Sequence, residues 1–474
     1  MEVLPLEILI EILSKLENIE LVTVQFVNKL FKKITENFSF EVNNFSESMA
    51  LRGQFNLIRW AHLSGCRLNS KTFSNAALKG YLNILKWGEL VDKKNIEIYD
   101  ICNNAALGGH LNVLKWIKTK FYKWRALTCA NAALGGHFEV LKWLHSNGCP
   151  LDNRTCRNAA LAGHLDILKW ARLNRCPWNV NTTSEAARHD HLEVLIWARS
   201  NNCPWDKTIC SGAARSGHLS ILQWARENGC AWDSSTSLEA TIGGHLNVLM
   251  WALENGCEWS ISICEQAALR GYFDILVWAH QNGCPWGTST CYSAVRGQHF
   301  DILKWAHKNN CPWDNATCAE AAFQGRLDIL KWARENGCPW GRFTCYSAVN
   351  QQHFDILKWA HENNCPWDNS TCSEAATKGR LDILKWAREN GCPWGNRTCA
   401  QAAKNNHLDI LIWAHQNGCP WDEDTSDSAA FGGHLEILKW IYENRCDWDY
   451  RAYHTAKQQG HIEVMNWIQE NGLR

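Results

Sequence analysis

Residues 325–340 read Gly-Arg-Leu-Asp-Ile-Leu-Lys-Trp-Ala-Arg-Glu-Asn-Gly-Cys-Pro-Trp, and versions of this stretch recur along the chain. From Trp116 onward, the tryptophan that corresponds to Trp332 returns every 27 residues. A fixed period of this size is typical of a stacked array of repeats rather than of separate globular domains. Sixteen units follow from the tryptophans at positions 60, 87, 116, 143, 170, 197, 224, 251, 278, 305, 332, 359, 386, 413, 440 and 467.

Each unit has the pattern of two short helices. In the unit quoted above, helices are expected over residues 317–324 and 327–336, each ended by a glycine. Asp328, Lys331 and Glu335 share one narrow stripe of the second helix, which should face solvent. The rest of that helix is apolar, so neighbours should cover it on both sides. The sequence therefore predicts an all-α solenoid of helix-turn-helix repeats.

Elementary energetics lead to the same conclusion. Burying one tryptophan is worth roughly 4–6 kcal/mol, whereas ordering the residues of one unit costs on the order of 40 kcal/mol. Stability must come from contacts between neighbouring units, as in other repeat arrays. We therefore expect the evenly spaced indoles to be buried between units.

The repeat also resembles a known family. The pattern Ala321-Ala322-x-x-Gly325-x-Leu327-Asp328-Ile329-Leu330-Lys331 is similar to the ankyrin repeat, although the period is shorter than the usual ankyrin length of about 33 residues. The resemblance implies an ankyrin-like solenoid over residues 43–474, with its β-fingers missing or reduced. Short-period arrays of this type are similar to those abundant in giant DNA viruses. That likeness implies a viral protein that acts in the host cytoplasm.

Residues 1–42 carry a different pattern. Leu4-Pro5-Leu6-Glu7-Ile8-Leu9, Ile12-Leu13-Ser14-Lys15-Leu16 and residues 27–34 resemble the F-box in order and spacing. The resemblance implies docking onto the Skp adaptor of a cullin ubiquitin ligase. A helical cap that only shields the first repeat is the alternative. The residues implied in Skp binding are Leu4, Pro5, Ile8, Leu9, Ile12, Leu13, Leu16, Val27 and Leu30.

Composition limits the classes of partner and compartment. Lysine plus arginine and aspartate plus glutamate each number 48, so no long-range field attracts a nucleic acid as the main partner. The first residues lack the basic start of a secretory signal, and no uncharged run is long enough to cross a membrane. We expect a soluble monomer inside the cell, in the cytoplasm.

The 23 cysteines are periodic as well. Thirteen follow the repeat tryptophan by six residues and ten precede it by fourteen. No Cys-x-x-Cys pair occurs, which argues against structural zinc. One fixed place per repeat is typical of a buried packing position, so we expect reduced thiols and no metal site.

The recurring histidines have two readings. His110, His137, His164, His218 and His245 could be catalytic or metal-binding. They occupy one turn of each unit, where tyrosine or arginine can replace them, so we expect them to bond neighbouring backbone and to join repeat to repeat. No nucleophile–base pair, paired carboxylates or phosphate loop stands out. The sequence therefore predicts neither an enzyme nor a cofactor.

One position is a candidate for target binding. Leu78, Leu107, Leu134 and Leu161 occupy it in four consecutive units, and Arg188 and Arg215 follow in the next two. Stacking could display the leucines as an apolar ridge, or each leucine could lie under the next repeat. We therefore expect a protein-interaction adaptor that recruits targets to a Skp-cullin-F-box ubiquitin ligase. The alternative is a non-catalytic scaffold or decoy that sequesters host proteins.

Overall fold

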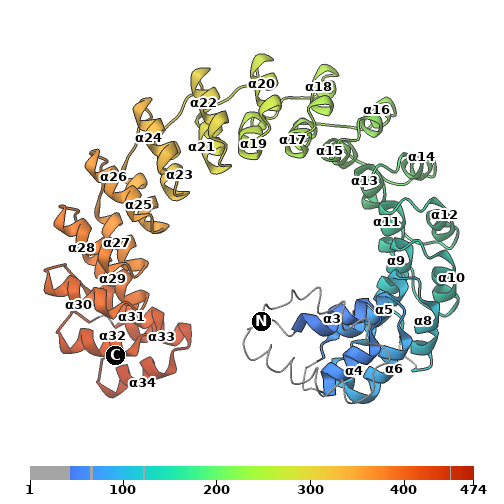
Figure 1. The fold of residues 1–474 in the computed structure, drawn as a ribbon, viewed down its shortest axis with the longest axis horizontal. Coiled ribbons are helices and arrows are strands. Elements are labelled where there is room, and N and C mark those ends of the chain that lie inside the picture. Colours follow the sequence, from blue (N-terminus) through green and yellow to red (C-terminus); the bar gives the residue numbers. More distant parts are fainter. Residues whose placement is uncertain (1–42, 64–67, 121–122, 449, 474) are drawn as a thin grey trace, which may run out of the picture. The chain divides into compact units, whose positions relative to one another are not determined.

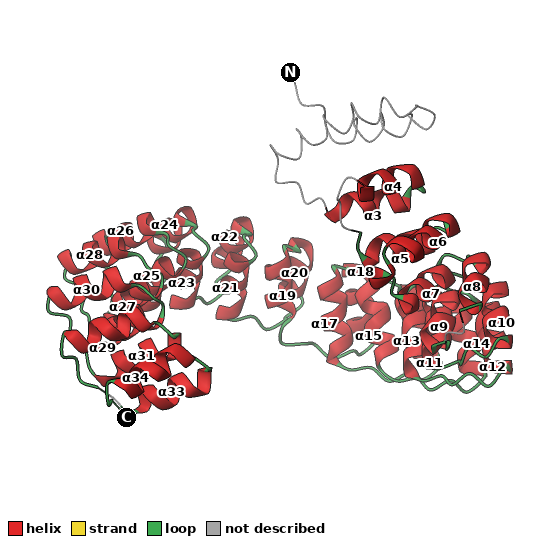
Figure 2. Cartoon of the chain, turned by 90° about the horizontal axis from the view of Figure 1, so that it is seen from below, coloured by secondary structure: helices red, strands yellow, loops and turns green. Residues whose placement is uncertain are grey.

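The computed structural model describes residues 43–63, 68–120, 123–448 and 450–473. Every element within these residues is helical and none is a strand (Figures 1 and 2). The α-helices of the described residues form sixteen consecutive pairs, which confirms the predicted all-α repeat solenoid. The predicted Skp-binding residues between Leu4 and Leu30 lie outside the described residues.

The first helices of the pairs carry odd numbers and the second helices carry even numbers. The first helices are α3 (Asn43–Leu51), α5 (Ser70–Leu78), α7 (Ile98–Leu107), α9 (Ala126–Leu134), α11 (Asn153–Leu161), α13 (Val180–Arg188), α15 (Thr208–Ser216), α17 (Ser234–Gly243), α19 (Ile263–Arg270), α21 (Thr288–Arg296), α23 (Asn315–Phe323), α25 (Arg342–Asn350), α27 (Asn369–Thr377), α29 (Asn396–Lys404), α31 (Glu423–Gly432) and α33 (Arg451–Gln459). The second helices are α4 (Phe55–Leu63), α6 (Leu82–Val91), α8 (Leu111–Lys118), α10 (Phe138–Ser146), α12 (Leu165–Leu173), α14 (Leu192–Ser200), α16 (Leu219–Glu227), α18 (Leu246–Glu254), α20 (Phe273–Gln281), α22 (Phe300–Lys308), α24 (Leu327–Glu335), α26 (Phe354–Glu362), α28 (Leu381–Glu389), α30 (Leu408–Gln416), α32 (Leu435–Glu443) and α34 (Ile462–Glu470). A 3-10 helix, η1 (Lys93–Asn95), precedes α7.

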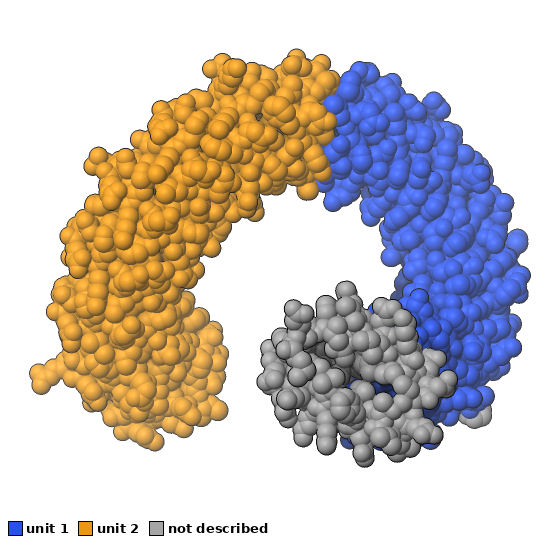
Figure 3. Space-filling model, viewed as in Figure 1, with its two compact units in different colours: residues 1–258 blue, residues 259–474 orange. Residues whose placement is uncertain are grey.

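The chain divides into two compact units of several repeats each, named unit 1 (residues 1–258) and unit 2 (residues 259–474) (Figure 3). Within each unit, consecutive first helices pack against one another, and each second helix packs mainly on the first helix of its own pair. From α9 to α17 in unit 1, the first helices lie on the concave side of these two layers (Figure 1).

Local sequence explains where the two helices of one repeat, α23 and α24, begin and end. The Asp314 carboxylate caps α23 by accepting a hydrogen bond from the Ala316 backbone N–H at 3.0 Å. Asn336 follows the end of α24 and donates its side-chain amide to the Trp332 carbonyl at 2.8 Å. Both helices therefore lie within two residues of their predicted bounds. Asp328, like Lys331 and Glu335 on its stripe, is exposed as predicted.

The expectation that the repeat tryptophans are fully buried is wrong. Trp332 and its counterparts in the described units are half-buried, and the core consists of smaller side chains. In this repeat the fully buried side chains are Ile329, Leu330 and Ala333 of α24 together with Cys318, Ala321 and Ala322 of α23, the helix on which α24 packs. Short first helices with small side chains pack closely. The second helices make few contacts with one another, so the rings between them remain partly open to solvent.

The half-buried rings still connect neighbouring units. Trp313, in the loop before α23, meets Trp332 of α24 edge-on with ring centroids 5.8 Å apart. His307 stacks on Trp313 at 4.2 Å. In other units an arginine takes the place of this histidine, as where Arg334 lies 4.2 Å above the ring of Trp340. Such ring contacts add about 0.5–1.5 kcal/mol each beyond the area they bury.

Candidate protein-binding surface

Of the five histidines named in the sequence analysis, His110, His137 and His218 bond the backbone of the preceding repeat as predicted. The same bond forms at His191, His434 and His461. His110 Nε2 lies 2.9 Å from the Leu78 carbonyl oxygen of the preceding unit, and His137 Nε2 lies 3.0 Å from the Leu107 oxygen. A carbonyl can only accept, so the ring nitrogen donates. The ring of His137 also packs on Gly109, where a Cβ atom would come within 2.5 Å of it. These histidines are structural hydrogen-bond donors.

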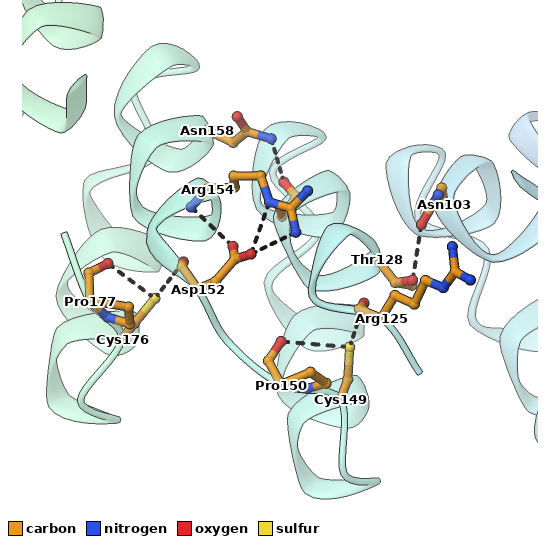
Figure 4. Close-up of polar contacts among 11 residues, drawn as sticks. Asn103, Arg125, Thr128, Cys149, Pro150, Asp152, Arg154, Asn158, Cys176 and Pro177 are labelled. Carbon is orange, nitrogen blue, oxygen red and sulfur yellow. Dashed lines mark hydrogen bonds and ion pairs between the residues drawn. The ribbon is translucent and has the colours of Figure 1, made fainter. Parts of the chain in front are cut away.

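The cysteines are likewise structural. In Figure 4, the Cys149 thiol points to the carbonyls of Arg125 and Pro150, at 3.3 and 3.9 Å. The Cys176 thiol makes the same contacts with Asp152 and Pro177, at 3.1 and 3.7 Å. All cysteines among the described residues are buried and free of disulfide bonds.

In nine units two of these thiols lie side by side, and the partners are 20 residues apart in sequence: Cys129–Cys149, Cys156–Cys176, Cys210–Cys230, Cys264–Cys284, Cys291–Cys311, Cys318–Cys338, Cys345–Cys365, Cys372–Cys392 and Cys399–Cys419. Burial raises the pKa of Cys102, and likewise that of Cys203, to about 12. A thiol kept protonated in this way is a poor nucleophile.

Two negative findings concern the described part of the chain. No group of three or more His, Cys, Asp or Glu residues there could hold a metal ion. None of the helices there is long and apolar enough to cross a membrane.

An asparagine position on the first helices also ties units together. Asn131 donates its side-chain amide to the Asn103 carbonyl at 3.2 Å. Asn158, labelled in Figure 4, donates to the Ala130 carbonyl at 3.0 Å. Each acceptor lies 28 residues earlier, on the preceding first helix. An asparagine that bonds the preceding helix fills the groove between the two first helices, so the groove has no room for a partner there.

The predicted leucine row lies near the C-terminal ends of the first helices. Leu78, Leu107, Leu134 and Leu161 are each half-buried, neither fully displayed nor fully covered. The backbone carbonyls of Leu78, Leu107 and Leu161 accept the histidine hydrogen bonds. Whether these side chains bind a target remains a prediction.

In the next two repeats, arginine replaces leucine at this position of the first helix. Arg188 of α13 and Arg215 of α15 are both exposed. At the asparagine position of α15 stands Gly212, which has no side chain to fill the groove. A pocket of about 440 Å³ opens there, lined by Arg188, Ser211, Gly212, Arg215, Ser216 and Glu239. The sequence signal for it was one glycine in a row of larger residues, and our sequence analysis missed it.

The two arginines of the pocket differ in their partners. Arg215 Nη1 lies 2.6 Å from Glu239 Oε2 of α17. Among the described residues, the Arg188 guanidinium has neither a hydrogen-bond partner nor an ion-pair partner. Its Nε would lie 3.9 Å from a Cβ atom placed on Gly212, so the side chain runs along the floor of the pocket. The pocket therefore holds one uncompensated positive charge.

Unit 2 has a smaller pocket on its first helices, of about 350 Å³, lined by Asn396, Arg397, Ala400, Gln401, Asp424, Asp427 and Ser428. Its charged groups are already used in part. Arg451 of α33 lies 3.1 Å from Asp424 Oδ1, and the Thr455 hydroxyl donates to Asp427 Oδ1 at 2.5 Å.

Comparison with known proteins identifies the N-terminal segment. Residues 1–43 match the family model of the F-box domain, which confirms the predicted F-box. No curated protein sequence matches the chain.

Several solved repeat structures show a distant likeness. The human ASB11 ankyrin repeat domain is 18% identical with a TM-score of 0.29, and the match covers 33% of this chain and 84% of that one. The pentatricopeptide repeat protein PPR10 in complex with an 18-nt psaJ RNA element is 11% identical with a TM-score of 0.27, covering 98% and 94%. PPR10 from maize gives 12% and 0.21, covering 99% and 94%. TM-scores this low support no statement about the fold or partners of this chain.

Proposed function

We propose, from the F-box domain at residues 1–43, that this chain recruits target proteins to a Skp-cullin-F-box ubiquitin ligase. The observation that carries the proposal is the position of this domain, directly in front of a long array of helix pairs. F-box domains generally bind the Skp adaptor, and repeat arrays of this kind generally bind proteins. The chain would bring two proteins together, and ubiquitin transfer would be the chemistry of the ligase.

The experiment is co-precipitation of the Skp adaptor with the full chain. Wild type should retain the adaptor, and Leu9→Asp combined with Leu13→Asp should release it, because a carboxylate cannot enter an apolar interface without a large desolvation cost. The matched control is Leu90→Asp with Leu173→Asp, at array positions that are 85% and 83% exposed. This control should bind like wild type.

The alternative is a scaffold or decoy that holds proteins without ubiquitination. Failure of the wild-type chain to bind the Skp adaptor, with captured proteins still present in the precipitate, would favour this alternative over the ligase adaptor. The short-period repeat leads us to place either activity in the cytoplasm of a host cell, with the chain acting as a monomer of viral origin.

The leucine row remains the proposed target contact of the early units. Changing Leu107, Leu134 and Leu161 together to serine should abolish target capture, because it removes half-buried apolar surface from three neighbouring first helices. Changing the same three to methionine keeps an apolar side chain of similar volume and should preserve capture. Capture by a folded triple-serine variant would remove the row from the proposal.

A further inference from the structure

We propose that the pocket between α13, α15 and α17 anchors an oxyanion carried by a peptide segment of the target. The oxyanion would be the carboxylate of an acidic side chain or the phosphate of a phosphoserine. The inference rests on the proposed adaptor function and names the chemistry of the segment that the array holds. Its first support is the free Arg188 guanidinium in a pocket of about 440 Å³, a size that accepts a side chain and its neighbours.

Charge complementarity selects an anion. The guanidinium of Arg188 presents several N–H donors in one plane, a geometry that matches carboxylate and phosphate oxygens. Arg215 lies at the same position one repeat later and forms an ion pair with Glu239, at 2.6 Å. An incoming anion would therefore meet one uncompensated cation and a second cation whose charge is shared. Ser211 and Ser216 add hydroxyl groups to the lining.

The glycine supplies the space. An asparagine at the position of Gly212 would behave as Asn158 does, since Asn158 donates to the carbonyl 28 residues earlier. For Gly212 that carbonyl belongs to Ser184, and its oxygen is the atom nearest to a Cβ placed on the glycine, at 3.8 Å. No contact is shorter, so the backbone accepts a side chain here without strain. The pocket is open because Gly212 has no side chain at a position where the neighbouring repeats carry Glu185 and Glu239.

A peptide fits this site better than a nucleic acid. The formal net charge of the chain is zero, so there is no broad basic surface of the kind that neutralises many phosphates. One free guanidinium beside a partly paired one suits a single anionic side chain. Two carboxylates lie on the neighbouring first helices: Glu185, whose Oε1 is 3.9 Å from Arg157, and Glu239. They would repel a continuous polyanion.

The test is direct binding of fluorescein-labelled nonapeptides to the purified full chain, measured by anisotropy in 150 mM NaCl. The peptides share one Gly/Ser/Ala background and carry three central residues that are all glutamate, all phosphoserine, all glutamine or all serine. We expect the glutamate or the phosphoserine peptide to bind at least ~10-fold more tightly than its neutral counterpart, as a charge-assisted hydrogen bond provides. Whichever of the two binds more tightly identifies the source of the oxyanion.

Three variants locate the binding. Arg188→Glu should weaken the anionic peptide ~10-fold or more, because it reverses the free charge. Gly212→Asn should do the same by filling the pocket, while its thermal stability stays at or above that of wild type. Arg296→Glu is the matched control: Arg296 is exposed at the same position of α21, where Ser293 replaces the glycine, and this variant should bind like wild type.

Several results would overturn the inference. These are absence of binding by both anionic peptides, equal binding of the neutral peptides, or equal losses in Arg188→Glu and Arg296→Glu. An 18-nucleotide single-stranded RNA that binds more tightly than the peptides and is lost in Arg188→Glu would also overturn it. Skp binding by the Gly212→Asn variant separates this failure from failure of the proposed function, because the F-box domain is unchanged in that protein.

Discussion

Substituting Gly109 by alanine tests whether the histidine contact holds neighbouring repeats together. Gly109 has φ +78° and lies under the ring of His137, so a Cβ atom would be 2.5 Å from Nδ1. Gly148 has nearly the same φ, +81°, but nothing lies within 4 Å of its Cβ position. The two substitutions therefore share the backbone penalty and differ only in the histidine.

The magnitudes follow from these contacts. Left-handed backbone costs an alanine about 1–2 kcal/mol, part of which is offset by the lower entropy of the unfolded chain. Gly148→Ala should therefore cost about 1 kcal/mol. Gly109→Ala must also displace His137 from the Leu107 carbonyl, 3.0 Å away, and losing that partly buried bond adds about 1–2 kcal/mol. Its total is about 2–3 kcal/mol.

Hydrogen–deuterium exchange resolved by peptide is the suitable assay, because an array opens locally and not as one two-state unit. Exchange in α7 and α9 should accelerate about 30-fold or more in Gly109→Ala. Exchange in α10 and α11 should accelerate only about 5-fold in Gly148→Ala. In a His137→Ala background, Gly109→Ala should cost no more than Gly148→Ala. Equal acceleration by the two glycine variants, or an undiminished cost in that background, would refute the reasoning.

Three further predictions compare variants at single positions. Thr317→Val should raise the stability by about 1 kcal/mol, because the buried Thr317 hydroxyl has no hydrogen-bond partner among the described residues. Thr128→Val should lower the stability by a similar amount, because the Thr128 hydroxyl donates a hydrogen bond to Asn103 at 3.0 Å. Thermal denaturation that gives the same sign of change for both variants would contradict this prediction. Burial raises the pKa of Cys203 to about 12, so the thiol's contribution to the free energy of unfolding is complete below the pKa of an unfolded thiol, about 8.5, and is lost as the pH rises towards 12. Between pH 9 and 11, the free energy of unfolding in urea should fall about 1.4 kcal/mol per pH unit less steeply in Cys203→Ala than in wild type. Parallel slopes in the two proteins would argue against this prediction. Arg226 stacks at 4.2 Å on Trp232, so Arg226→Ala should lower the free energy of unfolding by about 1 kcal/mol. Arg226→His should recover part of this loss, because His280 stacks on Trp286 of its own loop at 3.9 Å. If urea unfolding shows the histidine variant to be no more stable than the alanine variant, the stacking contact does not stabilise the protein.

The period and the helix bounds could be predicted because both depend on spacing along the chain. Gly325 and Gly337 mark the ends of the two helices in sequence, and both have positive φ in the structure. The inter-repeat role of the histidines could also be inferred, because tyrosine and arginine replace them at the same position, as at Tyr272 and Arg326. No shared catalytic chemistry survives such exchanges.

Depth and pairing could not be predicted in the same way. Periodicity gives the face of a helix but not how closely the next helix approaches, and this distance decides that Trp332 is half-buried while Leu330 is fully covered. The same limit hid the pocket. Whether an asparagine reaches back to the preceding helix, as Asn158 does over 28 residues, depends on the distance between two helices, and only then does Gly212 leave a gap.

The histidine bond spans a single junction, and this has a consequence for how such a chain can change. Where the bond forms, as at His110 and His137, one unit supplies the ring donor and the preceding unit supplies the carbonyl acceptor, so a copied unit of this kind brings its own connectors. Residues 287–340 and 341–394 differ at nine of 54 positions, as expected of such a copy. Lengthening the array then requires no adjustment elsewhere, and the residues on the first helices are left free to diversify.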